Sequence, residues 1–233
     1  MTQRWLSGLS ASALLLGCAG EAVRPDSERL RQRAVVALAN HQTASAQKFL
    51  QAALAAEKPA LTRDQRATAA DLRRELAGID VSMDDLRTAE RLYREALTLL
   101  LYPPTGPTEA IINLRTQLAS LCYRQGRLPE AAEFYREVLR LETSSLGTEH
   151  PDVRNTLSIL GGLELKLGRR TEAEALFRRQ LAVAQKLPGA EKREAATVLD
   201  NLADVLEQSG RSAEATECRS QAKQIRHKLC DEC

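Results

Sequence analysis

Aromatic and histidine side chains are scarce in this sequence. Only 3% of the 233 residues are Phe, Trp or Tyr, and there are three histidines. The apolar content is carried by Leu and Ala, which suits helices that pack closely through small residues. The histidines, His41, His150 and His227, are far apart, and none stands near a nucleophile motif. With no glycine-rich phosphate loop and no paired-carboxylate signature either, the sequence predicts no catalytic residue, no metal site and no cofactor.

A strong net charge is also missing. The formal net charge is +2, and the arginines are interleaved with Glu and Asp along the whole chain. Nucleic-acid binding needs a basic stripe or patch, often with aromatic residues between the basic ones. The sequence therefore predicts no nucleic-acid partner.

The sequence has no apolar run long enough to span a membrane. Its most apolar segment, Trp5 to Leu16, has about a dozen residues, whereas a transmembrane helix needs about 20. A short apolar run at the start of a chain is typical of a signal peptide, which we expect over residues 1–17.

The letters Leu15-Leu16-Gly17-Cys18 resemble the lipobox of bacterial lipoproteins, whose Cys is acylated and becomes the mature N-terminus. The resemblance implies a lipidated Cys18, followed by a tether over residues 18–26 and held at the membrane by several acyl chains such as palmitate. Ala19 stands where an Asp would imply the inner membrane, so the outer membrane, facing the periplasm, is favoured. The alternative is an ordinary cleaved signal peptide with a chance Cys.

The remaining sequence is repetitive. Gly126, Gly168 and Gly210 stand 42 residues apart, and Ala131, Ala173 and Ala215 follow them in the same register. The step reaches back to Ala89 and, with one extra residue, to Ala46. Internal repeats of this length indicate a solenoid.

The apolar residues from Ser27 onward have a helical period, which predicts an all-α fold of about five antiparallel helix pairs over residues 27–229. The pairs are expected at about 27–60, 61–104, 105–146, 147–188 and 189–229, before a Cys-containing tail at 230–233. The second helix of the third pair is predicted from Pro129 to Glu142. Thr171 and Glu174 predict a capping box in the fourth pair.

A Gly at the turn, an Ala five residues later, an aromatic residue four after that and an apolar residue three further resemble the tetratricopeptide repeat. The third copy has all of these, with Ala119, Gly126, Ala131, Tyr135 and Val138. The fourth departs from the pattern at Gly161 and Gln180. The linker Leu146-Gly147-Thr148-Glu149-His150-Pro151 resembles the kinesin-light-chain subtype. The resemblance implies a right-handed superhelical solenoid that binds a protein or peptide in a concave groove.

The first helix of each pair lines that groove in this family. Transfer by register gives as groove residues Asn113, Thr116, Gln117, Ser120, Arg124, Asn155, Ser158, Ile159, Gly162, Lys166, Thr197, Asp200, Asn201, Asp204 and Gln208. Their polar side chains can bind the backbone of an extended peptide. The paired Lys and Asn residues of a carboxylate clamp are missing, and Asp200 and Asp204 stand towards the end of the groove, so we expect a mixed or cationic peptide. The alternative is that these residues are only solvated helix faces.

The cysteines of the repeats have separate roles. Cys122 falls on an inward face and is predicted to be a small core residue. His227, Cys230 and Cys233, with Cys218 nearby, form a weak zinc or thiol pattern. In the fifth pair Arg219 and Lys223 replace apolar stacking residues, which predicts a capping helix.

Together these features predict a membrane-anchored, non-enzymatic scaffold that binds a protein or peptide in the cell envelope, in an assembly or secretion complex. One alternative is an oligomeric structural subunit that uses its convex faces or tail. A thiol or metal protein is the other. Nothing in the sequence points to a particular oligomeric state.

Overall fold

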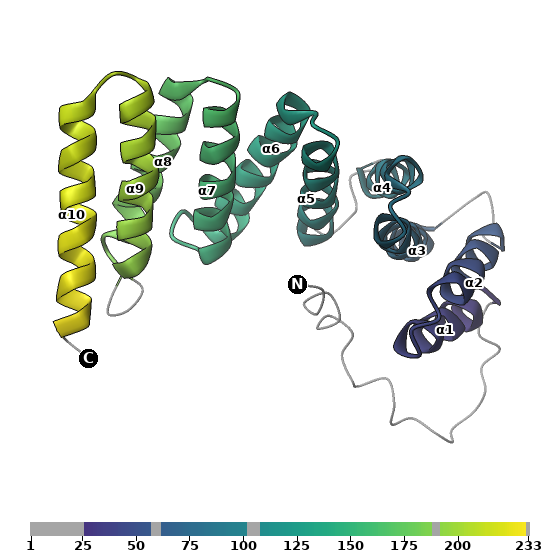
Figure 1. Ribbon diagram of the computed structural model, residues 1–233. Coiled ribbons are helices and arrows are strands. Elements are labelled where there is room, and N and C mark those ends of the chain that lie inside the picture. The colour runs from purple at the N-terminus through teal and green to yellow at the C-terminus, as the bar shows by residue number, and fades with distance from the viewer. Residues whose placement is uncertain (1–25, 57–61, 102–107, 188–191, 232–233) are drawn as a thin grey trace. The chain divides into compact units, whose positions relative to one another are not determined.

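The computed structural model of the chain describes residues 26–56, 62–101, 108–187 and 192–231. These residues form ten α-helices and no strand (Figure 1), which confirms the all-α prediction. The chain divides into two compact units, residues 1–58 and 59–233. The boundary lies close to the expected end of the first pair.

The first unit holds α1 (Asp26–Ala39) and α2 (Thr43–Ala55), packed against each other. The helices of the second unit are α3 (Arg63–Ser82), α4 (Leu86–Leu101), α5 (Thr108–Arg124), α6 (Leu128–Leu146), α7 (Pro151–Lys166), α8 (Arg170–Ala184), α9 (Lys192–Gln208) and α10 (Ser212–Asp231). Each of these eight packs on the next one in the chain. Figure 1 shows the pairs α5/α6, α7/α8 and α9/α10 side by side.

Helix α6 is longer than its sequence predicts. It ends at Leu146 rather than Glu142, and the Ser144 and Ser145 hydroxyls both donate to the carbonyl oxygen of Leu141 at 2.8 Å. These side-chain bonds let two serines that resemble linker residues stay helical. Gly147, with a φ of 87°, then ends the helix.

Every pair turns through one residue in the left-handed region. Gly126, Gly168 and Gly210 have φ between 75° and 76°, and the same register position holds Asp84 at 63° and His41 at 58°. The amide of the next residue bonds back to the preceding helix in each turn, as from Arg127 to the carbonyl of Cys122 at 2.8 Å. The turn is therefore kept in the two pairs that lack its glycine.

The predicted capping box of α8 is wrong. The helix begins at Arg170 without a side-chain cap, and Glu174 accepts hydrogen bonds from Arg178 and Arg211 instead. A capping box does occur at the start of α3, where Thr62 and Gln65 bond each other's backbone amides at 2.9 and 3.4 Å.

Aromatic side chains fill the space between helices of the second unit. Phe177 of α8 packs with Val198 and Leu202 of α9, and a Cβ atom added at Gly161 of α7 would lie 2.8 Å from its ring. That contact explains why a glycine replaces alanine at this position. Cys122 is fully buried, as predicted, and burial raises the pKa of its thiol.

Each of the last three junctions between pairs holds a shielded carboxylate between two arginines. Glu90 contacts Arg94 and Arg127 at 2.9 and 2.5 Å. At this junction the more exposed Glu130 also contacts both arginines, at 3.2 and 3.0 Å. The same two arginine positions recur with Glu164 between Arg136 and Arg169, and with Glu174 between Arg178 and Arg211. Glu174 stands at the register position of Glu90, whereas Glu164 reaches its junction from the other side, out of α7.

Candidate functional site

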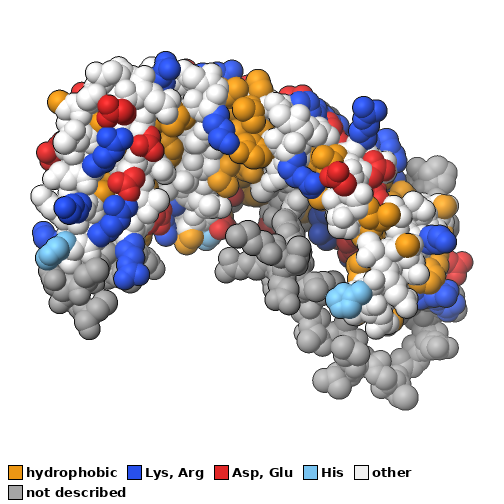
Figure 2. All heavy atoms as spheres, in the orientation of Figure 1, with side chains coloured by type: hydrophobic (Ala, Val, Ile, Leu, Met, Phe, Trp, Pro, Cys, Tyr) orange, Lys and Arg blue, Asp and Glu red, His pale blue; other side chains and the backbone are white. Residues whose placement is uncertain are grey.

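A continuous groove runs between α5 and α7, above α6. It consists of two adjoining hollows of about 530 and 540 Å³, which share Tyr135 and Ile159 in their linings. We call the first, which contains Arg124 and Lys166, the basic hollow, and the second, which contains Glu109, Glu142 and Asp152, the acidic hollow. Figure 2 shows a column of hydrophobic side chains at this place, between α7 and α5.

Most of the predicted groove residues of α5 and α7 line these hollows. Those in the acidic hollow are Asn113, Thr116 and Asn155, and those in the basic hollow are Ser120, Arg124, Ser158, Ile159, Gly162 and Lys166. Gln117 lies on α5 outside both linings. The structure thus brings polar residues of two neighbouring pairs to one surface.

The predicted groove residues of α9 do not join this surface. Asp200 accepts a hydrogen bond from Arg226, and Asp204 accepts one from Arg219 at 3.2 Å. Both arginines belong to α10, so the two carboxylates are engaged within the fifth pair. Thr197, Asn201 and Gln208 lie on the same helix, outside both hollows.

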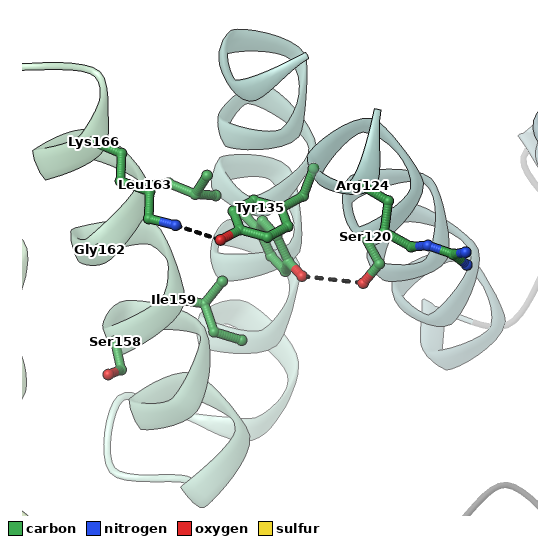
Figure 3. A pocket seen from close by; sticks show the side chains of 9 residues that line it. Ser120, Arg124, Tyr135, Ser158, Ile159, Gly162, Leu163 and Lys166 are labelled. Atoms are coloured by element: carbon green, nitrogen blue, oxygen red, sulfur yellow. Dashed lines mark hydrogen bonds between the residues drawn. The ribbon is translucent and has the colours of Figure 1, made fainter. Parts of the chain in front are cut away.

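The basic hollow has an apolar floor and a bridge between its two helices (Figure 3). Lys166 of α7 lies 4.8 Å from the ring centroid of Tyr123 on α5 and donates a hydrogen bond to its hydroxyl. Tyr123 is 43% exposed and Ile159 36%, although both are large apolar side chains. Arg124 points away from α7 and pairs with Asp84 at 3.0 Å. Lys166 and Tyr123 therefore present the accessible recognition groups of this hollow.

The acidic hollow contains a buried carboxylate from α6. Glu142 is 6% exposed, and its Oε2 atom has no hydrogen-bond partner among the described residues. Burial raises the pKa of Glu142, and the charge of Asp152 adds to that rise. A hydrogen bond from Thr156 and the charge of His150 oppose it. Glu142 is thus an anion that the described part of the fold only partly compensates.

The sequence contains a signal for Glu142 that the groove prediction missed, because it considered only first helices. The positions 42 residues before and after it hold Leu100 and Ala184, which are both buried. The neighbouring copies thus place a buried apolar residue where this copy has a glutamate. Such a polar residue at a core position of the repeat is a signal for a functional side chain.

The first unit has an open hollow of its own, of about 520 Å³. Arg29, Arg33 and Val36 of α1 and Phe49 of α2 line it, and the guanidinium of Arg33 lies 4.4 Å from the Phe49 ring centroid. Val36 is 60% exposed. None of the predicted groove residues lies in this unit.

The predicted lipid and thiol sites fall largely outside the described residues. Residues 1–25, with Cys18, and Cys233 lie beyond them, while the backbone of Cys230 is still helical within α10. No described helix is long and apolar enough to cross a membrane. Over the described ranges no three His, Cys, Asp or Glu side chains are grouped so that they could hold a metal ion.

The sequence pattern of the tetratricopeptide repeat matches residues 110–179 and 152–226, together half of the chain. The chain belongs to the tetratricopeptide-repeat family. Both hollows of the α5–α7 groove lie within the first matched stretch or directly beside it, and proteins built from such repeats generally bind protein partners. No curated protein matches the chain.

Several solved structures resemble this chain in fold. A Podosopora anserina protein described as a kinesin light chain, with nearly identical TPR-like repeats, is 21% identical with a TM-score of 0.68, over 88% of this chain and 98% of that one. BtubC (BKLC) from P. vanneervenii is 19% identical with a TM-score of 0.66, over 87% and 80%. MamA is 13% identical with a TM-score of 0.63, over 88% and 94%.

Proposed function

We propose that this tetratricopeptide-repeat protein is a scaffold that binds an extended protein segment in the α5–α7 groove. The observation that carries the proposal is the convergence of polar side chains from α5 and α7 on two adjoining hollows with an apolar floor. Asn113 and Asn155 are exposed in the acidic hollow, where each amide can both donate to and accept from a peptide backbone.

The groove is tested by the double variant Asn113→Ala with Asn155→Ala. A lost hydrogen bond costs roughly 0.5 to 1.5 kcal/mol, so the two together should weaken partner binding by about one to two orders of magnitude. Asn201→Ala is the matched control, since Asn201 is an amide on a first helix outside both hollows. Binding is read by photocrosslinking in cells from position 158 in the groove, with position 172 on α8 as the reference site.

Equal crosslinking of the double variant and the control would contradict groove binding. It would favour the alternative of a structural subunit that assembles through its other faces or its tail. Melting temperature and helical content should barely change in the double variant, because exposed substitutions usually alter stability by less than about 0.5 kcal/mol each. Asn201 is half-buried, so the melting temperature of its variant is measured as well.

We further propose that the scaffold acts at the cell envelope, anchored through lipid on Cys18. The resemblance of Leu15 to Cys18 to a lipobox supports this, and several acyl chains would make attachment effectively permanent. Cells fed with labelled palmitate should incorporate label into the wild-type chain and not into Cys18→Ala. Label on the Cys18→Ala variant would contradict the lipoprotein assignment.

A further inference from the structure

Glu142 differs from the shielded carboxylates at the junctions between pairs. Glu90, Glu164 and Glu174 each lie between two arginines supplied by the fold. Glu142 is 6% exposed, and the groups that act on it are the Thr156 hydroxyl, Asp152 and His150, with no arginine or lysine among them. Its Oε2 atom has no hydrogen-bond partner among the described residues. A buried anion without a permanently charged partner is unfavourable, so this position is suited to a cation from outside the fold.

The lining of the acidic hollow strengthens the attraction for a cation. Glu109 of α5 and Asp152 of α7 also line it, whereas no Lys or Arg does so among the described residues. Asn113 and Asn155 add amide oxygens that can accept from a guanidinium. The volume of about 540 Å³ falls within the range usual for ligand pockets and has room for a long side chain.

We propose that Glu142 is the receptor for an arginine or lysine side chain of the bound segment. The guanidinium or ammonium would bond to the free Oε2 atom and do for Glu142 what paired arginines do for the other three carboxylates. This inference rests on the proposed peptide-binding function and names the chemistry of the ligand.

The basic hollow, with Lys166, is suited to an acidic residue of the same bound segment. Thr156, beside Glu142, and Lys166 are ten residues apart on α7, which is about 15 Å at 1.5 Å per residue. An extended peptide covers about 3.3 Å per residue. The segment should therefore carry an acidic residue four or five positions from its basic one, and this spacing sets its direction along the groove.

The chain itself has few cations that could occupy the acidic hollow. The segment from Tyr102 to Pro107, next to α5, contains no Lys or Arg. Arg4, Arg24 and Lys58 lie outside the described residues. Arg4 belongs to the expected signal peptide, so the experiment includes Arg24 and Lys58 as competing occupants.

The test is an NMR titration of the full-length chain with three probes, N-acetyl-arginine methylamide, its lysine counterpart and its neutral isostere N-acetyl-citrulline methylamide. The amide resonances of Asn155 and Thr156 should shift with the arginine or lysine probe. Citrulline should bind at least tenfold more weakly, because its urea group has no charge. Glu142→Gln should remove the preference for charge. Glu133→Gln should retain it, because Glu133 lies on the same helix with a side chain that is 73% exposed.

Several outcomes would overturn the inference. Equal binding of arginine and citrulline probes would do so, as would the absence of any shift in the wild-type protein or an unchanged charge preference in Glu142→Gln. Glu142→Gln removes only a charge, and its circular dichroism spectrum verifies that it folds. If Arg24→Gln or Lys58→Gln alone moved the Thr156 resonance, the occupant would be the chain itself and not a partner.

The same variant separates this inference from the proposed function. If Glu142→Gln still crosslinks its partner from position 158 at wild-type level, the groove function stands and the cation receptor is refuted. If the probes bind at Glu142 but no partner crosslinks from the groove, the proposed function fails alone.

Discussion

A single methyl group added at Gly161 should show how tightly α7 and α8 are packed. The Cβ atom of Gly161→Ala would lie 2.8 Å from two ring carbons of Phe177, whereas carbon atoms prefer about 3.5 to 4.0 Å. The ring cannot retreat easily, because it is 2% exposed and packs with Val198 and Leu202 of α9. We expect overpacking to cost about 1 to 3 kcal/mol.

The neighbouring glycine provides a matched control. Both substitutions should gain roughly 1 kcal/mol of helix propensity, but a Cβ atom at Gly162 meets nothing within 4 Å. Gly162→Ala should therefore stabilise the protein by about 1 kcal/mol. Gly161→Ala should leave it destabilised by about 0 to 2 kcal/mol. The difference between the two variants, about 1 to 3 kcal/mol, isolates the contact with Phe177.

Thermal unfolding followed by circular dichroism measures this difference. For a chain of this size each kcal/mol corresponds to roughly 2 to 4 °C in Tm. In a Phe177→Leu background the smaller side chain should turn Gly161→Ala into a stabilising change. Equal Tm values for the two alanine variants would refute the packing argument.

Four other predictions concern charge, turns and stacking. Burial raises the pKa of Glu142, so the folded protein becomes less stable as this carboxyl ionises above about pH 4.5. Glu142→Gln should therefore raise Tm at pH 7 and not at pH 4. An equal rise at both pH values would contradict this. Burial also opposes ionisation of Glu174, but hydrogen bonds from its arginines prevail and lower its pKa, so its stabilisation is present above pH 4.5 and lost on acidification. Glu174→Gln should then lower Tm at pH 7, by the equivalent of about 1 kcal/mol, and by progressively less as the pH falls below 4.5. His41→Gly should stabilise the first unit by about 1 kcal/mol in calorimetry, because it relieves a left-handed φ of 58°, whereas His41→Ala should not. Deleting residues 188–233 should uncover Phe177 and increase binding of a hydrophobic dye; a soluble truncated chain with unchanged melting would argue against stacking by the fifth pair.

The helices could be predicted well because a solenoid repeats its local rules. The register of Gly126 leads to the turn residues Asp84, 42 residues earlier, and His41, a further 43 residues earlier, which do not resemble glycine. Helix ends were harder to predict, since Ser144 and Ser145 extend α6 through bonds to a single carbonyl group. Thr171 has the letters of a capping box, but Glu174 is drawn to arginines of its own junction.

The groove was only partly predictable for a related reason. Register shows which residues occupy equivalent positions, and it placed Asn113 and Asn155 on one surface. It cannot show which side chains neutralise each other, so Asp200 was assigned to the groove although Arg226 engages it. Glu142 was missed because it stands out only by an oxygen atom without a hydrogen-bond partner among the described residues. Whether a side chain finds a partner depends on contacts between pairs, which the sequence register does not show.

The helix pairs have similar backbones, but they differ in which pair supplies the shielded carboxylate at each junction. Glu90 comes from the pair before its junction, Glu164 from the pair after it, and Glu174 again from the pair before. Loss of residues 105–146 would bring Glu90 and Glu164 together as like charges. Loss of residues 147–188 would leave Arg136 and Arg211 facing each other with neither Glu164 nor Glu174 between them.

Loss of both pairs, residues 105–188, would restore a junction with one shielded carboxylate. Glu90 would then lie between Arg94 and Arg211, opposite the apolar Leu206. A chain of near-identical units is prone to align one copy with the wrong neighbour, during folding or through recombination of its gene. The shielded carboxylate comes by turns from the pair before its junction and from the pair after it. A pair placed beside the wrong neighbour would therefore create a junction with two shielded carboxylates or with none. Gain or loss of two helix pairs together should therefore disturb the ion pairs at the junctions less than gain or loss of one helix pair.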